Sequence, residues 1–420
     1  MLRNYLLTAW KVFMRRKLFT AINLACIVLT LVVLMVITAL LETTFWPSGV
    51  ESRSARFLQV YGIRSESADR HTTRTTLLGY KTIDKYLKPL GRLNGVERVS
   101  AITTPGLVSV YQGDRVSRLD LRRVDADYWK IMDFEVLAGR LPDEDDDRSG
   151  RLVAVVNATT ARQLFPDKPA VGHAVGQTVS VGGQRFQIIG VVGDVMQMNA
   201  YADIWAPLST FPSTSYQNEL TGQFAALIMA RTPGDLPRIQ REVERVARTY
   251  VDDDPHTYVV TTFWADSKLD VFARTLLDKH SEADSGAIEL LLMIAGAMLL
   301  FMLLPALNLV NLNMGRIMER SSEIGVRKAF GATTRQLAGQ LVVENVLLSL
   351  AGGLIGLACA QGALWWLDTS QLIPYLEVHI NPKVFASGML IAFVFGLLSG
   401  VIPAWKMSRL DPVHALKGAA

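Results

Sequence analysis

Four histidines and one acidic run are the features between positions 46 and 283 whose residue types could support metal binding or acid–base catalysis. The run "PDEDDDRSG" at 142–150 could bind calcium, but it lacks the glycine and the distal glutamate of a calcium loop. Because like charges repel and extend a chain, we interpret it as a solvated loop. The histidines have neither metal-site nor triad spacing; they are His71, His173, His256 and His280. We therefore expect no catalytic residue, no metal site and no cofactor in this chain.

A charged, glycine-punctuated stretch, "SSEIGVRKAFGATTRQLAGQL" at 321–341, carries more information. Ser322 can cap a short helix whose first turn holds Glu323, a favourable charge at the positive end of a helix. Glu323 and Arg327 are four residues apart, the spacing at which opposite charges meet on one helix face. These residues predict a short, well-started helix.

The second half of this stretch contains signals that end one helix and begin another. Gly331 supplies a C-terminal stop, and Thr333 with Gln336 forms a capping box for the following helix. One interpretation is a solvated connector. However, "IGV" and "AF" give the short helix an apolar side, rimmed by Arg327 and Lys328, that suits docking into a groove of another protein.

Four uncharged or nearly uncharged segments flank these features. A bilayer core about 30 Å thick is crossed by roughly 20 apolar helical residues. The segments are long enough for this, and they comprise Ile22–Leu41, Leu290–Leu312, Leu341–Trp366 and Val384–Trp405. The two cysteines, Cys26 and Cys359, fall inside them, so no disulfide framework is expected.

Basic residues near the ends of the segments predict their orientation. Lysine and arginine gather before the first segment, between the second and third, and after the fourth, and these are cytoplasmic positions by the positive-inside rule. Both termini and the 321–341 stretch are therefore predicted to be cytoplasmic, and residues 46–285 to be outside. The net charge of +4 and the pI near 9.0 reflect this inner face, so nucleic acid is not an expected partner, whereas membrane lipid is.

We therefore predict a membrane protein with four transmembrane α-helices and a large extracytoplasmic α+β domain between the first and second. The predicted domains, in order, are an amphipathic interfacial helix at 1–17, a first span at 18–45, the external domain at 46–283, a second span with a stalk extension at 284–313, a cytoplasmic coupling-helix region at 314–337, a third span at 338–367, a short external loop at 368–382, a fourth span at 383–406 and a cytoplasmic tail at 407–420.

Strand and helix signals alternate in the external domain. "LVAVV" reads as a strand, followed by a helix that is capped near Asn157 or Thr159 and stops at Pro166. Two alternating runs joined by Gly182-Gly183 predict a β-hairpin. Ile239, Val243, Val246 and Tyr250 have helical spacing. The mixture favours α+β subdomains over a pure sandwich.

The second span is predicted to extend beyond the bilayer as a stalk. Its apolar pattern continues outward through "FARTLLDKHSEADSGAIELL" and inward toward Met318. A single helix of about 45 residues is roughly 70 Å long. Such a helix could connect the cytoplasmic stretch with the external domain as a lever.

Three stretches together carry a family resemblance. "EIGVRKAFGATTRQL", "ENVLLSLAGGLIGL" and "PAWKMSRLDPVHALKG" closely resemble the permease subunits of the MacB/FtsX/LolC-type ABC transporters, and "VVNATTARQLFPDKPAVGHAVGQTVSVGGQRFQIIGVVGDV" looks like the external domain of the MacB-like branch. In that family the loop after the second span is a coupling helix that the ATPase subunit receives. The resemblance implies that this contact is made by Glu323, Ile324, Gly325, Arg327, Ala329, Gly331 and Ala332.

The resemblance also implies partners and a location. Family members work as dimers that transmit ATP-driven motion at the inner face to the external domain. Since the sequence contains no G-x-x-x-x-G-K-[ST] loop, ATP and Mg are expected to bind a separate ABC ATPase subunit. A second permease subunit, identical or different, is implied, and a periplasmic adaptor with a TolC-like channel is a further candidate. The implied location is the bacterial inner membrane.

Three classes of function stay open on the sequence alone. The favoured one is a permease for export of amphipathic compounds such as antimicrobial peptides, macrolides or lipid-linked cargo. The alternatives are an FtsX-like regulator of a periplasmic cell-wall hydrolase and the sensor arm of a peptide-sensing system. The large, MacB-like external domain favours transport.

Overall fold

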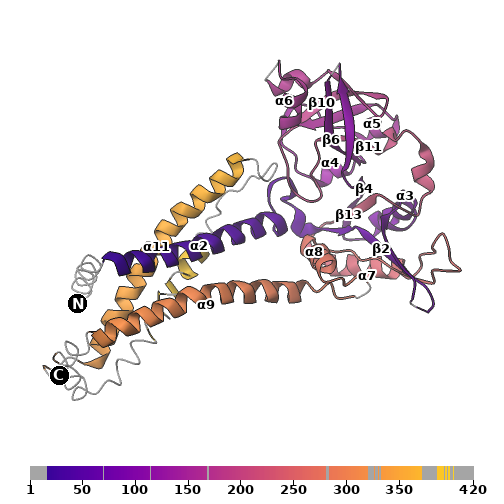
Figure 1. The fold of residues 1–420 in the computed structure, drawn as a ribbon. Coiled ribbons are helices and arrows are strands. Elements are labelled where there is room, and N and C mark those ends of the chain that lie inside the picture. The colour runs from indigo at the N-terminus through magenta and orange to yellow at the C-terminus, as the bar shows by residue number, and fades with distance from the viewer. Residues whose placement is uncertain are drawn as a thin grey trace. The chain divides into compact units, whose positions relative to one another are not determined.

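The computed structural model shows two compact units, with boundaries after Glu42 and after Leu290. We call the described part of Thr43–Leu290 the sheet unit and the described remainder the helical unit (Figure 1). The residues described are 17–69, 71–113, 115–167, 170–280, 283–319, 326, 330, 333–370, 386–391, 393–394, 396–397 and 401.

The described strands of the sheet unit pair into one mixed sheet of 14 strands. Their bounds are β1 Phe57–Val60, β2 Gly62–Glu66, β3 Thr73–Leu78, β4 Val96–Thr103, β5 Gly106–Gln112, β6 Arg115–Val124, β7 Val136–Gly139, β8 Val153–Asn157, β9 Thr178–Val181, β10 Gln184–Val192, β11 Ile204–Pro207, β12 Thr221–Gly222, β13 Phe224–Ala230 and β14 Val260–Thr262. Because β11 pairs with both β8 and β6, the strands β11-β8-β10-β9-β5-β6 close into a ring. Beyond β6 the sheet continues as an open layer in the order β4-β13-β3-β2-β14.

Helices of the sheet unit are short and cover this sheet locally. They are α3 Tyr80–Thr82, α4 Tyr128–Ile131, α5 Glu144–Arg148, α6 Ala158–Leu164, α7 Leu236–Ala247 and α8 Lys268–Leu276. One core fills the ring, around Val156 and Phe186. Another lies under the open layer, where Ile239 and Val243 of α7 are completely buried. The unit is thus an α+β domain, as predicted.

The glycine pair predicted to turn a hairpin does so. Strands β9 and β10 pair antiparallel, with Val181 opposite Gln184. Gly182 and Gly183 between them have φ of 57° and 83°. Both values lie in the left-handed region that two-residue hairpin turns require and that glycine adopts without a steric penalty. The hairpin prediction is confirmed.

The strand–helix prediction around Asn157 is also confirmed. Strand β8 leads into α6, and the Asn157 side chain caps this helix by accepting a hydrogen bond of 2.7 Å from the Thr160 amide. The helix ends at Leu164, two residues before the predicted stop at Pro166. The buried Asn157 is therefore a structural residue of the sheet unit.

The acidic run at 142–150 is a short helix, so the prediction of a solvated loop was wrong. Asp143 caps α5 by accepting hydrogen bonds from the amides of Asp145 and Asp146. The Asp146 side chain is fully buried, and Arg140 and Arg151 both pair with it. The hydrogen bond from Arg140 is the main reason that the pKa of Asp146 falls from 3.8 to about 2. Arginines from the flanking chain offset the repulsion on which the loop prediction rested.

The predicted continuous stalk is also interrupted. Helix α8 ends at Leu276, and the next helix, α9 (Ala287–Glu319), begins eleven positions later in the numbering. Between them, Asp278 has a φ of 53° and Gly286 a φ of 76°, left-handed conformations that a right-handed helix cannot contain. The 33 residues of α9 correspond to about 50 Å, longer than a bilayer core but shorter than the predicted lever.

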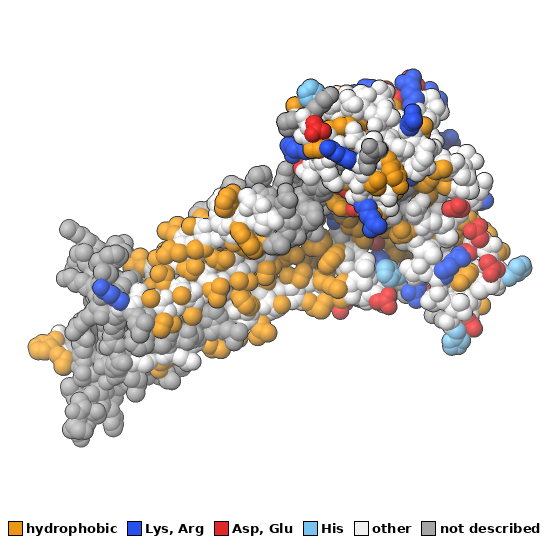
Figure 2. All heavy atoms as spheres, turned by 45° about the horizontal axis from the view of Figure 1, so that its top comes forward, with side chains coloured by type: hydrophobic (Ala, Val, Ile, Leu, Met, Phe, Trp, Pro, Cys, Tyr) orange, Lys and Arg blue, Asp and Glu red, His pale blue; other side chains and the backbone are white. Residues whose placement is uncertain are grey.

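The helical unit contains the described parts of α2 (Lys17–Phe45), α9 and α11 (Thr334–Ser370). Two helical segments among the described residues are long and apolar enough to cross a membrane, Thr20–Phe45 and Val342–Leu367, and Ala287–Leu303 is a shorter apolar helix. Apolar side chains cover the visible face of these helices (Figure 2). Of the predicted fourth span, only eleven residues are described, and all are helical. Residues 1–16, 371–382 and the tail at 407–420 lie outside the described residues.

Candidate functional site

We call residues 321–341 the coupling stretch. Most of it lies outside the residues that the structure describes. This applies to Ser322, Glu323, Ile324, Gly325, Arg327, Ala329, Gly331 and Ala332. The described residues of the stretch before the next helix include Val326 and Phe330. The Phe330 amide donates a hydrogen bond of 3.0 Å to the Val326 carbonyl, the i to i−4 contact of one helical turn. The Phe330 side chain is 89% exposed.

Reciprocal hydrogen bonds form the start of α11. The Thr333 amide donates to Gln336 Oε1 at 3.0 Å, and the Gln336 amide donates to Thr333 Oγ1 at 3.4 Å. Such a pair satisfies amides that have no partner within the helix. Thr333 and Gln336 thus form the predicted capping box, and α11 begins at a defined boundary.

Glycines bring α2 and α11 together within the helical unit. A Cβ at Gly352 would lie only 2.6 Å from Ile27 Cγ2, and one at Gly356 would lie 3.3 Å from Leu31 Cβ. Ile27 and Leu31 are buried there with Leu348. Because lipid tails are as apolar as leucine, helix association in membranes depends on such close approach. Gly352 and Gly356 therefore pack inside this chain.

A second candidate site is the N-terminal end of α8, which sequence reasoning missed. Lys268 Nζ lies 2.9 Å from Glu51 Oε2, and both side chains are buried. Lys268 Nζ also donates to the carbonyl of Trp46, the residue after α2, at 3.3 Å. Glu51 Oε1 accepts hydrogen bonds from the amide and the side chain of Asn199, at 2.8 and 3.1 Å.

Helix α8 is also tied to the segment that precedes α9. Asp270 in its first turn accepts a hydrogen bond from Ser285, two residues before α9 begins. Thus one short helix contacts both segments through which the chain leaves the sheet unit. We call Trp46, Glu51, Lys268, Asp270 and Ser285 the α8 junction. Its residues are far apart in the sequence and have no motif spacing, so no sequence signal could have found it.

The other end of α8 is fixed to the sheet. Arg274 donates to both carboxylate oxygens of Asp266, at 2.9 and 3.2 Å. Asp266 in turn exchanges backbone hydrogen bonds with Gln59 of β1. Burial raises the pKa of Asp266, and the hydrogen bond from Arg274 opposes this rise. A displacement of α8 must therefore act on the sheet.

No catalytic constellation is found in the described part of the chain. Among those residues, no three His, Cys, Asp or Glu side chains are grouped so that they could hold a metal ion. The main chemical capacity of the two candidate sites is to hold segments together.

Two family models match the chain. Residues 20–246 match the MacB-like periplasmic core domain, and residues 295–412 match the FtsX-like permease C-terminal domain. The first match covers more than half of the chain, and the second includes the coupling stretch.

The chain is similar to ABC transporter permeases along most of its length. An uncharacterised ABC transporter permease, YknZ, from Bacillus subtilis is 23% identical over 79% of this chain and 78% of its own length. The macrolide export ATP-binding/permease protein MacB of Chromobacterium violaceum is 25% identical over 90% of this chain, but the chain spans only 58% of that protein. The periplasmic region of MacB from Actinobacillus actinomycetemcomitans has 16% identity and a TM-score of 0.37, over 53% of this chain and 92% of that one.

Proposed function

Because the chain belongs to the family of ABC transporter permeases that combine a MacB-like periplasmic core domain with an FtsX-like permease domain, we propose that it transmits the motion of a separate ATPase subunit to its sheet unit. Permeases of this family work with ATPase partners and are bacterial inner-membrane proteins. ATP and Mg²⁺ are bound by that partner in our proposal, and this chain holds neither.

The observation that carries the proposal is the α8 junction together with the defined start of α11. We take residues 321–341, which lie within the segment that matches the FtsX-like permease C-terminal domain, as the coupling region, and the reciprocal Thr333–Gln336 bonds mark the start of α11 there. Within the sheet unit, Lys268 and Asp270 hold the two segments that enter and leave it. In our proposal these two features serve as the input and the output of the mechanical transmission.

Four spans are part of this proposal. They are α2, α9, α11 and the segment at 383–406, with both termini in the cytoplasm. Cysteines introduced at Gly182 and at Ser322, in a chain with Cys26→Ala and Cys359→Ala, test the arrangement. Position 182 is expected to react with an impermeant maleimide from outside and position 322 only from inside. The reverse pattern contradicts the topology.

We propose amphipathic compounds as cargo: antimicrobial peptides, macrolides or lipid-linked molecules. The support is the macrolide export for which the MacB relatives are named, although this chain spans 58% or less of those proteins. In such a complex two permease subunits act together, and an adaptor with a TolC-like channel completes the exit path. Co-purification of a cell-wall hydrolase instead of an adaptor would point to an FtsX-like regulator.

A charge-reversed coupling stretch tests the proposal. The double variant Gly325→Arg/Arg327→Glu places a large cation and a reversed charge where the ATPase groove is expected. We predict that it abolishes the stimulation of ATP hydrolysis by the permease while leaving membrane insertion intact. The measurement is the ATPase rate of the reconstituted complex, with and without this chain.

The matched control is Arg185→Glu, a charge reversal at an exposed residue of β10 in the sheet unit. It is expected to stimulate ATP hydrolysis like the unchanged chain. Equal stimulation by the double variant and the control would contradict a coupling role for 321–341.

A further inference from the structure

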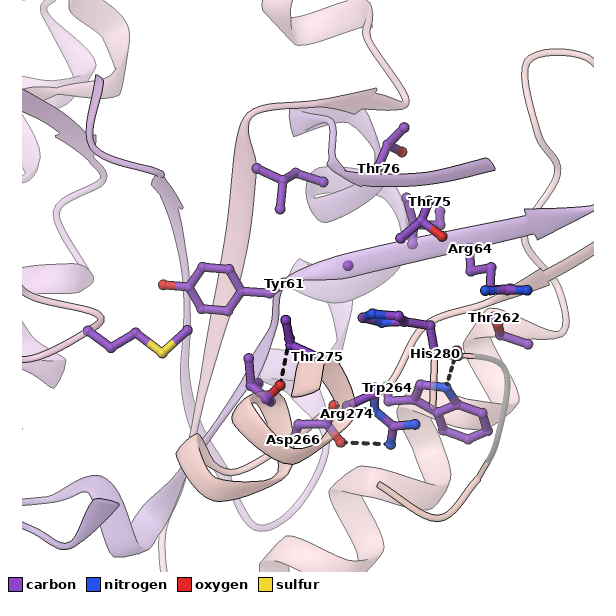
Figure 3. A pocket seen from close by; sticks show the side chains of 15 residues that line it. Tyr61, Arg64, Thr75, Thr76, Thr262, Trp264, Asp266, Arg274, Thr275 and His280 are labelled. Carbon is purple, nitrogen blue, oxygen red and sulfur yellow. Dashed lines mark hydrogen bonds and ion pairs between the residues drawn. The ribbon is translucent and has the colours of Figure 1, made fainter. Parts of the chain in front are cut away.

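A cavity of about 360 Å³ lies in the sheet unit beside α8. Strands β2 and β3 form one wall, β14 and the following residues another, and α8 a third (Figure 3). Its volume is within the range of small-molecule sites, roughly 300 to 1,000 Å³. The whole cavity belongs to a single compact unit.

One end of the cavity is lined by hydrogen-bond donors. The register places Arg64 of β2 opposite both Thr75 of β3 and Thr262 of β14, so the three side chains share a sheet face. In Figure 3, Arg64 and Thr262 lie at the same end of the cavity as His280. Arg64 Nε donates a hydrogen bond of 2.9 Å to Glu66. Within the described part of the chain its two Nη groups make no hydrogen bond, so they can donate to a ligand. The Thr262 hydroxyl is buried without a partner in the described part of the chain.

Glu66, which accepts from Arg64 Nε at 2.9 Å, is not among the residues that line the cavity. Asp266 is the acidic residue among the described lining, and both of its oxygens accept from Arg274. Arg274 also lies 5.2 Å from the centre of the Trp264 ring. The buried Thr262 hydroxyl and the two Arg64 Nη groups can donate to an acceptor in the cavity. The chemistry at this end therefore selects a carboxylate or a phosphate.

The opposite end of the cavity is apolar. Tyr61 lies there, away from Arg64 and His280 (Figure 3). Its hydroxyl donates a hydrogen bond of 3.1 Å to Asn199 Oδ1, so the part of Tyr61 that lines the cavity is its ring. Leu77 and Val271 add aliphatic surface. The cavity thus has one donor-lined end and one apolar end.

We propose that this cavity binds a small anionic amphipath, with its head on Arg64, Thr262 and His280 and its apolar body along Tyr61 and Val271. The proposal goes beyond the proposed function, because it assigns a ligand site within one sheet unit. Val271, Arg274 and Thr275 of α8 line the cavity, and the same helix carries Lys268 and Asp270 of the α8 junction. A bound amphipath therefore stiffens the helix that joins the sheet to both outgoing segments.

Photolabelling of the full chain in lipid nanodiscs tests this site. The probe is decanoate with a photoreactive diazirine in its tail, and the labelled peptides are identified by mass spectrometry. We expect label on the cavity walls, competed by decanoate or decyl phosphate but not by 1-decanol or decyltrimethylammonium. The stronger of the two anionic competitors identifies the head group. Since no ATPase or nucleotide is present, the result is independent of the coupling proposal.

Two variants make the test specific. Arg64→Gln removes the charged donor and is expected to raise the decanoate concentration for half-competition about tenfold, the loss expected for one charge-assisted hydrogen bond. Thr275→Trp places a large ring from the exposed face of α8 into the cavity and is expected to abolish the label.

The matched controls are Arg245→Gln, which removes the arginine of a surface pair on α7, and Leu276→Trp, the adjacent exposed position of α8. Both are expected to label like the unchanged chain.

Three results would overturn the proposal. They are label that avoids the cavity walls, equal competition by 1-decanol and decanoate, and unchanged labelling of both Arg64→Gln and Thr275→Trp. Circular dichroism of each variant shows whether its sheet is retained. Loss of label in Thr275→Trp with a retained sheet supports the site even if Arg64→Gln fails to fold.

Discussion

In the sheet unit, charged side chains are buried in pairs, whereas in the helical unit the described helices leave large apolar side chains exposed. Glu51, Lys268 and Asp146 are all 5% exposed or less, and each has a partner of opposite charge. By contrast, Leu292 is 68% exposed and Trp365 67% exposed. Figure 2 shows such apolar side chains along the helices.

This difference shows where each unit obtains its stability. The sheet unit has its own cores and satisfies its buried charges internally, so it is built as a self-supporting body. The helical unit has a small buried cluster around Ile27 and Leu31, and its remaining apolar surface needs lipid or another subunit.

Lys268→Met tests the buried charge pairs of the sheet unit and is expected to have the largest effect on the free energy of unfolding. It leaves the Glu51 carboxylate buried without its cation, which typically lowers the free energy of unfolding by about 3–5 kcal/mol. The double variant Glu51→Gln/Lys268→Met is expected to recover a large part of this loss. The measurement is the urea midpoint of the β-sheet signal in circular dichroism.

The matched control for this variant is Lys130→Met. Lys130 pairs with Glu144 at the surface, where both side chains are more than a third exposed, and such pairs contribute about 0–1 kcal/mol. An equal loss in Lys130→Met and Lys268→Met would break the distinction between buried and exposed pairs.

Gly352→Leu has the next largest expected effect, this time in the helical unit. The new side chain meets Ile27 at the contact of α2 and α11, and overpacking of this kind costs about 1–3 kcal/mol. The loss is measured by thermal unfolding of the chain in detergent, with its cysteines kept reduced, and is monitored by the helical signal in circular dichroism. Gly362→Leu lies on the same helix with no atom within 4 Å of the added Cβ and is expected to be neutral. Identical melting of the two variants would show that α2 does not pack on Gly352.

Asp146→Asn has the smallest expected effect and depends on pH. Its pKa is lowered to about 2 in the folded chain, so its charge stabilises the fold above about pH 4 and this contribution disappears as the pH falls toward 2. At neutral pH, Asp146→Asn is expected to lower the free energy of unfolding by about 1–2 kcal/mol, since both arginine partners are half-exposed. Unfolding midpoints at pH 7 and pH 3 measure it. Asp145→Asn, in a largely exposed pair with Arg148, is expected to change neither midpoint; a pH-independent loss in Asp146→Asn would rule out this cause.

The features that the sequence predicts correctly are local. The Gly182-Gly183 turn and the Asn157 cap are fixed by the chemistry of one or two residues, so flanking patterns suffice to place them. The acidic run was misinterpreted because Arg140 and Arg151 lie just outside it and neutralise Asp146. The stalk was misinterpreted because an apolar period continues across Asp278 and Gly286, whose left-handed backbone interrupts the helix.

Features that depend on distant residues escaped prediction. The α8 junction joins Glu51 with Lys268, and the cavity joins Arg64 of β2 with His280 after α8. Strand register in the sheet unit brings these residues together, and no spacing in the sequence encodes that register. The coupling stretch is the reverse case: its composition and resemblance identify it, while eight of its predicted residues lie outside the described part of the chain.

Hydrogen exchange of the α8 junction in the assembled complex tests mechanical transmission most directly. The permease with its ATPase is compared without nucleotide and after trapping with ATP and vanadate, and exchange is followed in peptides that cover 264–290. The proposed mechanism predicts that exchange of the α8 amides changes on trapping and that Gly325→Arg/Arg327→Glu removes the change. Unaltered exchange across 264–290 in a complex that hydrolyses ATP would contradict it.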